Sequence, residues 1–175
     1  MHKIAKRVEE LSPAPAAAGS KPPPFAPAAA AAARRQCILV RSGAYNPIHK
    51  LHLRSLYIAR KYLEERAGLE VLGGLVSPHH ATEVRSRFRT TACEIVPPRH
   101  RLAMARLAAG ESTWVTVDPW EVTRRRVMDY LSVLDHVRHL AEACFPAGGV
   151  GAAVKVIYLC SPEVQRANPA APQAG

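Results

Sequence analysis

Short apolar runs alternate with longer amphipathic stretches through the middle of this chain, and this order constrains the fold more than any other feature. The apolar runs have the length and β-branched content of strands, and between them apolar residues return at helical spacing. Strands separated by helices predict βαβ units, and therefore a parallel sheet with helices on both faces. The predicted strands are 37–40, 70–76, 114–117 and 154–159. The predicted helices are 50–66, one that opens at Pro97-Pro98, and about 120–144, with a polar loop over 79–96.

The two ends of the chain differ in composition from this alternating part. From Ser12 to Ala33 the residues are almost all alanine and proline, and the end of the chain has a similar character. Proline removes backbone donors and alanine brings little apolar area to a core, so such segments do not fold by themselves. We therefore predict a disordered arm over 1–35, one folded domain over 36–160 and a disordered tail over 161–175.

The charge balance favours an anionic partner. The formal net charge is +10 with histidines neutral, which suits nucleic acid, an anionic membrane surface or a phosphorylated small molecule. No apolar run approaches the length of a membrane span, and the beginning of the chain lacks the apolar core of a secretory signal. We expect a cytoplasmic or nuclear protein without a membrane partner, and organelle targeting by the alanine-proline arm stays open.

Four cysteines occur, and none pairs in a CxxC pattern: Cys37, Cys93, Cys144 and Cys160. This spacing favours reduced thiols over a disulfide frame or a zinc site. The sequence therefore predicts no metal site made by protein side chains.

The segment Gly43–His52 lies between the first predicted strand and the first predicted helix. A helix start offers free backbone N–H groups and a positive dipole end, which together suit a phosphate. His49 and His52 add two imidazoles at this point. In parallel sheets, ligands gather beyond the carboxyl ends of the strands, which is where this segment lies. The pattern predicts a nucleotide site, and the alternative is an exposed histidine pair with no ligand.

The same residues carry a resemblance to a known family. Gly43-x-Tyr45-x-Pro47-x-His49-x-Leu51-His52 resembles the GxFxPxHxGH motif of the HxGH nucleotidyltransferases, and its flanks are similar to eukaryotic nicotinamide or nicotinic acid mononucleotide adenylyltransferases. Three more segments follow that family in matching order: Gly74–Pro78, His100–Ala108 and Trp114–Glu121. The resemblance spans about Cys37 to Leu140. It implies a nucleotidyltransferase domain with a Rossmann-like parallel sheet and helices on both faces.

The resemblance also implies a reaction and a set of site residues. ATP and the mononucleotide would give the dinucleotide of NAD biosynthesis and pyrophosphate, with Mg²⁺ carried by the ATP phosphates. The implied catalytic residues are His49 and His52. The ATP and phosphate contacts implied are Gly43, Ala44, His52, Arg87 and Arg89, where the arginines replace lysines of the family. The mononucleotide contacts implied are Gly43, Ala44, Trp120 and Tyr130, although the last two also suit core packing.

Several features depart from the family, so alternatives stay open. After 154–157 the family has a Gly-Ala-Asp turn, whereas this chain continues Tyr158-Leu159-Cys160, and the family's later Ser/Thr-rich motif with arginine does not follow. We therefore expect an incomplete domain, truncated at its C-terminal end. One alternative is a non-catalytic or truncated nucleotide-binding relative. A basic nucleic-acid-binding protein is the least favoured, because neither an aromatic RNA-binding strand nor a basic recognition helix is evident. Amide or acid preference and homo-oligomer formation stay open.

His79 and His80 are predicted to be solvated residues of the 79–96 loop, and Arg124–Arg126 to be a solvated helix face. Trp114 is predicted to pack in the core.

Overall fold

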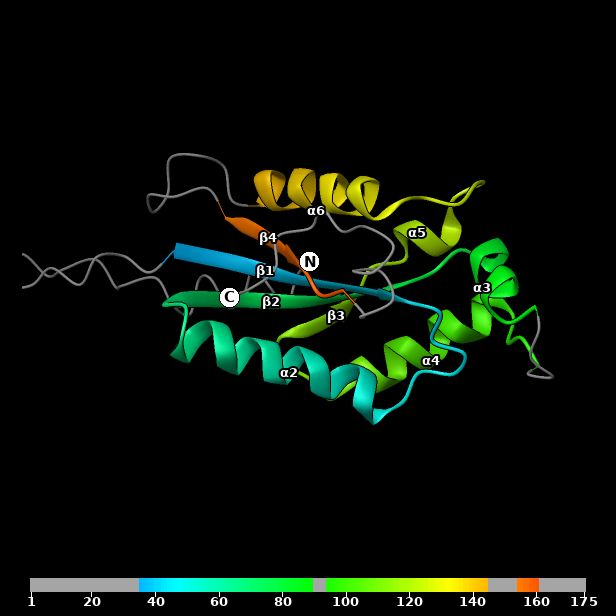
Figure 1. Cartoon of the computed structure of the whole chain (residues 1–175), viewed down its shortest axis with the longest axis horizontal. Coiled ribbons are helices and arrows are strands. Elements are labelled where there is room, and N and C mark those ends of the chain that lie inside the picture. Colours follow the sequence, from blue (N-terminus) through cyan, green and yellow to red (C-terminus); the bar gives the residue numbers. More distant parts are fainter. Residues whose placement is uncertain (1–34, 90–93, 145–153, 161–175) are drawn as a thin grey trace, which may run out of the picture.

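The computed structural model of this chain describes residues 35–89, 94–144 and 154–160, in which strands and helices alternate as predicted (Figure 1). In chain order the elements are β1 (Arg35–Gly43), α2 (Lys50–Glu65), β2 (Leu69–Pro78), α3 (Ala81–Arg87), α4 (Pro98–Gly110), β3 (Val115–Val117), α5 (Trp120–Thr123), α6 (Tyr130–Cys144) and β4 (Lys155–Tyr158). The predicted tail and nearly all of the predicted arm lie outside the described residues. Arg35, which the prediction places at the end of the arm, begins β1.

The four strands form one parallel sheet in the order β3-β2-β1-β4. Helix α6 covers one face of the sheet, and α2 and α4 cover the other (Figure 1). This arrangement confirms the predicted Rossmann-like class of parallel sheet with helices on both faces. It also sends the carboxyl ends of all four strands to the same edge, next to α3.

Alternation along β1 explains why both faces are apolar. Cys37 and Leu39 join the core under α2 and α4, while Ile38 and Val40 join the core under α6. Successive side chains of a strand point to opposite faces, so a continuous apolar run serves a sheet that is covered on both sides. The uninterrupted burial of β2, from Val71 onward, has the same cause.

Close packing between α2 and the sheet depends on Gly74 in β2. A Cβ at Gly74 would lie 2.9 Å from the ring of Trp114, which is 3% exposed and belongs to the core as predicted. Tyr57 meets the Trp114 ring edge-on with centroids 5.1 Å apart, and the guanidinium of Arg60 lies 4.9 Å from its centroid. The missing side chain at Gly74 thus makes room for the indole that joins α2 to the sheet.

Two predicted elements differ from the structure. The helix predicted over about 120–144 is two helices, α5 and α6, because the chain leaves helical geometry at Arg124 and Asp129 starts a new helix by accepting a 2.7 Å hydrogen bond from the backbone N–H of Ser132. The loop predicted over 79–96 contains α3, in which Glu83 pairs with Arg87 one turn later.

Across the described residues, no helix has both the length and the apolar character needed to span a membrane. Three of the four cysteines fall within the described residues and are free thiols: Cys37, Cys144 and Cys160. Cys93 lies outside the described residues.

Candidate functional site

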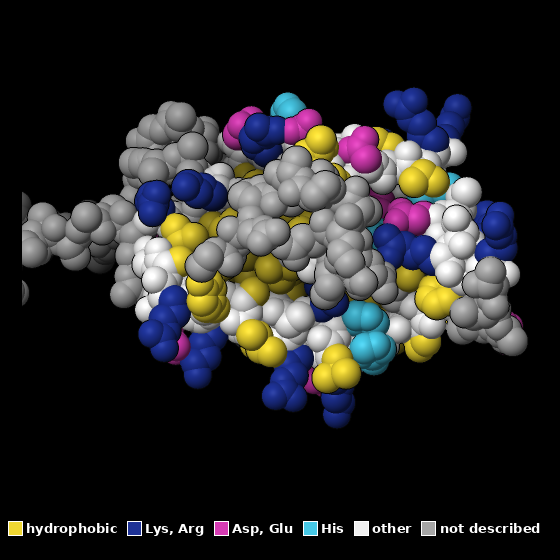
Figure 2. Space-filling view, in the orientation of Figure 1, with side chains coloured by type: hydrophobic (Ala, Val, Ile, Leu, Met, Phe, Trp, Pro, Cys, Tyr) yellow, Lys and Arg dark blue, Asp and Glu magenta, His cyan; other side chains and the backbone are white. Residues whose placement is uncertain are grey.

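A cavity of about 590 Å³ lies at the carboxyl ends of the strands. β2 lies on one side of β1 and β4 on the other, so the order of the strands reverses between β1 and β4. Ligands of open α/β sheets bind at such a switch point. The end of β1 contributes Arg41, Ser42 and Gly43 to the wall, and the end of β4 contributes Tyr158 and Leu159. Figure 2 shows histidine, basic and acidic side chains near one another at this end of the molecule.

The two histidines after β1 lie against each other at the start of α2. The rings of His49 and His52 stack with centroids 3.7 Å apart, and the backbone N–H of His49 donates to Nδ1 of His52 at 3.2 Å. Because Nδ1 accepts, the neutral ring of His52 carries its proton on Nε2, which is therefore a donor. Burial lowers the pKa of His52 to about 4, and the charges of His49 and Arg41 act in the same direction. His52 lines the cavity and is neutral at pH 7.

Tyr45 packs inside the turn between β1 and α2. Its backbone has a positive φ of 44°, its side chain is 1% exposed, and its hydroxyl donates to the carbonyl oxygen of Arg41 at 2.8 Å. A Cβ at Gly43 would lie 3.0 Å from the Tyr45 ring. The sequence predicts that Gly43 admits a nucleotide, and the structure supplies a reason within the chain: Tyr45 fills the space that a side chain at position 43 would need.

A buried arginine holds together the loops around the cavity. Arg101 of α4 is fully buried, and its guanidinium donates to the carbonyl oxygens of Ala44 at 2.8 Å, His79 at 2.9 Å and Val96 at 3.2 Å. These carbonyls belong to the turn after β1, the end of β2 and the segment before α4. Burial lowers the pKa of the Arg101 guanidinium from its usual value. Arg101 thus fixes the backbone on which the cavity wall is built.

Two buried titratable groups form the wall next to α3. Glu121 is 2% exposed and accepts a 2.7 Å hydrogen bond from the hydroxyl of Ser77, and burial raises its pKa to about 7. His79 is 6% exposed, and burial lowers its pKa to about 3, with Arg87 and Arg101 adding to the effect. The prediction that His79 is solvated is wrong, because the residues after β2 fold into α3 and cover its ring.

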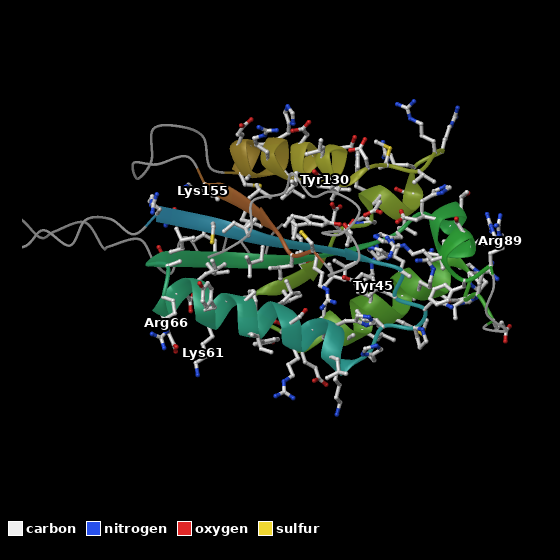
Figure 3. All side chains as sticks on the ribbon, viewed as in Figure 1. Tyr45, Lys61, Arg66, Arg89, Tyr130 and Lys155 are labelled. Carbon is white, nitrogen blue, oxygen red and sulfur yellow. The ribbon has the colours of Figure 1, made fainter. Side chains whose placement is uncertain are left out.

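The structure brings together part of the predicted site. Four predicted contacts line the cavity: Gly43, His52, Arg87 and Tyr130. Tyr130 begins α6, and its ring lies 5.8 Å from that of Tyr158 at the end of β4. Figure 3 shows Tyr130 beside α6 and Tyr45 near the ends of the strands. Ala44 and His49 belong to the turn beside the cavity but do not form its wall.

Two predicted contacts lie away from this cavity. Arg89 is exposed beyond the end of α3 and projects from the edge of the molecule (Figure 3). Trp120 lines a second cavity of about 370 Å³, between α5 and α6. Its ring stacks on His136 with centroids 4.4 Å apart, and Arg124 lies 5.0 Å from its centroid. These contacts hold the Trp120 indole at the second cavity and away from the first.

Among the residues that the sequence predictions left out of the site are His79 and Glu121, which line the cavity, and Arg101, which holds the backbone of its wall. Arg101 had a visible signal, because it falls in phase with Ala105 and Ala109 on the buried face of α4. An arginine at such a position requires buried acceptors. Glu121 lies in the segment Trp114–Glu121, which follows the family pattern, but its meeting with His79 had no such signal, because the two residues are 42 positions apart and meet only in the fold. Arg124–Arg126 are exposed as predicted, although they follow α5 and are not part of a helix.

Comparison of the sequence with known proteins identifies a matching family and several similar proteins. Residues 40–148 match the cytidylyltransferase-like family. The chain is 40% identical over 105 residues to nicotinamide/nicotinic acid mononucleotide adenylyltransferase 2 of Danio rerio. This alignment covers 60% of this chain and 32% of the relative. It is 30% identical over 110 residues to nicotinamide/nicotinic acid mononucleotide adenylyltransferase 1 of Bos taurus, and this alignment covers 63% of this chain and 37% of the relative. It is 31% identical over 134 residues to nicotinamide/nicotinic acid mononucleotide adenylyltransferase of Arabidopsis thaliana, and this alignment covers 73% of this chain and 49% of the relative. The aligned part thus spans between about a third and a half of these relatives.

Proposed function

Because this chain belongs to the cytidylyltransferase-like family, we propose that it acts in nucleotidyl transfer for NAD biosynthesis, moving AMP from ATP to nicotinamide or nicotinic acid mononucleotide. One observation supports this above all. At the switch point of the sheet, a neutral histidine donor at the start of α2 lines the same cavity as Arg41 and Arg87. A polyphosphate is the ligand that suits such a wall.

In this reaction no protein side chain needs to form a covalent bond with the substrate. A phosphate oxygen of the mononucleotide attacks the α-phosphorus of ATP, and the new P–O bond forms as the bond between the α-phosphorus and its bridging oxygen breaks. Pyrophosphate leaves with the electron pair of that bond. Catalysis therefore consists of alignment and of charge stabilisation on the transferring phosphoryl group.

Each cavity residue then has a physical role. His52 donates from Nε2 to the α- and β-phosphates, while His49 stacks on its ring and holds its tautomer through the backbone N–H. Arg41 and Arg87 bring positive charge to the same space. Tyr130, across the switch point, offers a ring to the mononucleotide. Arg89 and Trp120 have no nucleotide contact in this proposal, because both lie outside the cavity.

The cavity also fits an Mg²⁺ ion that arrives on the ATP phosphates. The carboxylate of Asp129 lines the same space, and oxygen ligands are those that Mg²⁺ prefers. When bound, the ion neutralises charge on the phosphates and favours the departure of pyrophosphate.

The test measures turnover and binding separately. Purified protein with ATP, either mononucleotide and Mg²⁺ should release pyrophosphate in a coupled phosphate assay. Calorimetry should show that His52→Ala weakens ATP binding by roughly tenfold or more, because a hydrogen bond to a charged group is lost. His139→Ala, at an exposed position on α6, is the matched control and should bind as the unaltered protein does.

Unchanged ATP affinity in His52→Ala would contradict the role given to this residue. ATP binding without pyrophosphate release would instead favour a non-catalytic nucleotide-binding relative. Binding of single-stranded RNA with a steep dependence on salt, together with no response to ATP, would favour a nucleic-acid-binding protein.

A further inference from the structure

Three side chains that could ligate a metal ion meet in the cavity wall. They are His79, just after β2, Glu83 in α3, and Glu121 in α5. Each offers a ligand atom, and these atoms all lie within 4.8 Å of one another. All three residues line the cavity of the candidate site, so an ion bound to them would face the space in which a nucleotide is proposed to lie.

The imidazole of His79 supplies a second, independent observation. The residue is 94% buried, yet its Nδ1 has no hydrogen-bond partner. The 3.3 Å contact of Nδ1 with Oε1 of Glu83 lacks hydrogen-bond geometry, and Nε2 lies 3.9 Å from Oε1 of Glu121. A buried polar atom without a partner costs free energy, so native structures rarely keep one without a reason. A bound cation would supply the missing partner.

The spacing suits a small ion. Bonds of 2.0–2.2 Å from a metal to nitrogen or oxygen place adjacent ligand atoms roughly 3.0–3.5 Å apart in tetrahedral or octahedral geometry. The distance of 3.3 Å between Nδ1 of His79 and Oε1 of Glu83 already falls in this range. We propose that His79, Glu83 and Glu121 bind a divalent transition-metal ion such as Zn²⁺, with its remaining positions open to the cavity.

The donor set and its surroundings select this class of ion. One imidazole nitrogen with two carboxylates suits Zn²⁺ and its neighbours better than Mg²⁺, which prefers oxygen ligands alone. Ser77 donates to Oε2 of Glu121, and Arg87 donates to Glu83 at 2.9 Å. Such partners orient ligating carboxylates in known metal sites.

This site goes beyond the proposed function and does not rest on it, because the protein alone supplies the ligands. Mg²⁺ in the proposed reaction is carried by ATP, whereas this ion would bind without nucleotide. Water or phosphate oxygens would complete its coordination from the cavity side.

The experiment titrates the full chain, stripped with chelator and free of nucleotide, with Co²⁺ and Zn²⁺. Co²⁺ binding is followed by visible absorption and Zn²⁺ binding by calorimetry. We expect one saturable site for each ion. His79→Gln and Glu83→Gln should each lower the affinity for the metal ion by at least about tenfold. Even residues that only hydrogen-bond to the ligands of a metal site contribute that much. His139→Gln, another histidine variant, should leave the affinity unchanged.

Glu83 is partly exposed on α3, so Glu83→Gln should keep the fold even where His79→Gln does not, and circular dichroism in chelator checks both. Absence of saturable binding would overturn the proposal. So would binding that both variants retain, or binding that His52→Ala abolishes while His79→Gln retains it.

Discussion

At the scale of single residues, the buried guanidinium of Arg101 joins three segments of backbone. It donates to three carbonyl oxygens from three segments and has no access to solvent. A lysine at this position is a point charge and cannot match the planar fork of donors. We expect Arg101→Lys to lower the free energy of unfolding by about 2–4 kcal/mol, because buried acceptors lose their partners.

Urea denaturation measures this loss. The matched control is Arg106→Lys, an arginine on the exposed side of the same helix, which should change stability by less than about 0.5 kcal/mol. Equal effects of the two substitutions would show that the three hydrogen bonds of Arg101 contribute nothing specific.

Glu121 makes stability depend on pH. Its pKa is about 7 in the folded protein and 4.5 in ordinary surroundings. Between these values the unfolded chain releases the proton while the folded protein keeps it, so the free energy of unfolding falls as the pH rises. The stabilisation is complete below pH 4.5 and is lost as the pH passes 7, on the order of 3 kcal/mol at most.

Glu121→Gln cannot ionise, so it should lack this fall. Denaturation at pH 5 and pH 8, with chelator present, compares the two proteins. The variant should gain stability relative to the unaltered chain at pH 8. Parallel pH profiles would mean that Glu121 is not held protonated by burial.

Some residues of the candidate site could be predicted from a continuous sequence motif, and others could not because their neighbours are distant in the sequence. The segment Gly43–His52 is a continuous motif at a strand end, so it places His52 at the cavity without knowledge of the rest of the fold. His79 and Glu121 meet across the chain, and no spacing in the sequence reports this. The same holds for Trp120, whose stacking on His136 depends on where α5 ends and α6 begins.

At the scale of elements, the packing of α2 on the sheet depends on Gly74. A methyl group at this position would lie 2.9 Å from the Trp114 ring, which is itself enclosed by Tyr57 and Arg60. We expect Gly74→Ala to destabilise the fold by about 1–3 kcal/mol, as overpacking of a core does. Thermal and urea unfolding measure the loss.

Gly110, the last residue of α4, is the matched control. A Cβ there meets nothing within 4 Å. Gly110→Ala should therefore be neutral or stabilise the protein by a few tenths of a kcal/mol, since alanine restricts the unfolded chain. If Gly74→Ala were equally harmless, the close approach of Trp114 would not be what requires glycine in β2.

Helices and strands could be predicted where a single local pattern, such as an apolar run or a proline pair, marks the element. Apolar runs located all four strands that the described residues contain, and Pro97-Pro98 marked the start of α4. The break between α5 and α6 was missed because the apolar spacing continues across it, although Asp129 before Ser132 is a helix-start signal. Helix α3 was missed because its seven residues are mostly polar and short helices carry little periodicity.

At the scale of the whole molecule, a net charge of +10 and a cavity bearing arginines predict that phosphate ligands stabilise the fold. ATP at one hundred times its dissociation constant should add about 2.7 kcal/mol to the free energy of unfolding. The melting temperature should rise by several degrees, and less at high salt, which screens exposed charges. Differential scanning fluorimetry measures the shift.

Adenosine, which lacks phosphates, is the matched ligand control and should shift the melting temperature far less. Equal shifts with ATP and adenosine would locate the binding energy in the base and not in the phosphates.

The two tryptophans of the chain lie in different layers: Trp114 packs with the core under α2 and α4, and Trp120 packs against the core under α6. Each layer thus carries its own fluorophore. In Trp120→Phe the emission reports on one side of the sheet, and in Trp114→Phe on the other. Time-resolved refolding of these two variants would reveal whether the cores on the two sides of the sheet form in one step or one after the other.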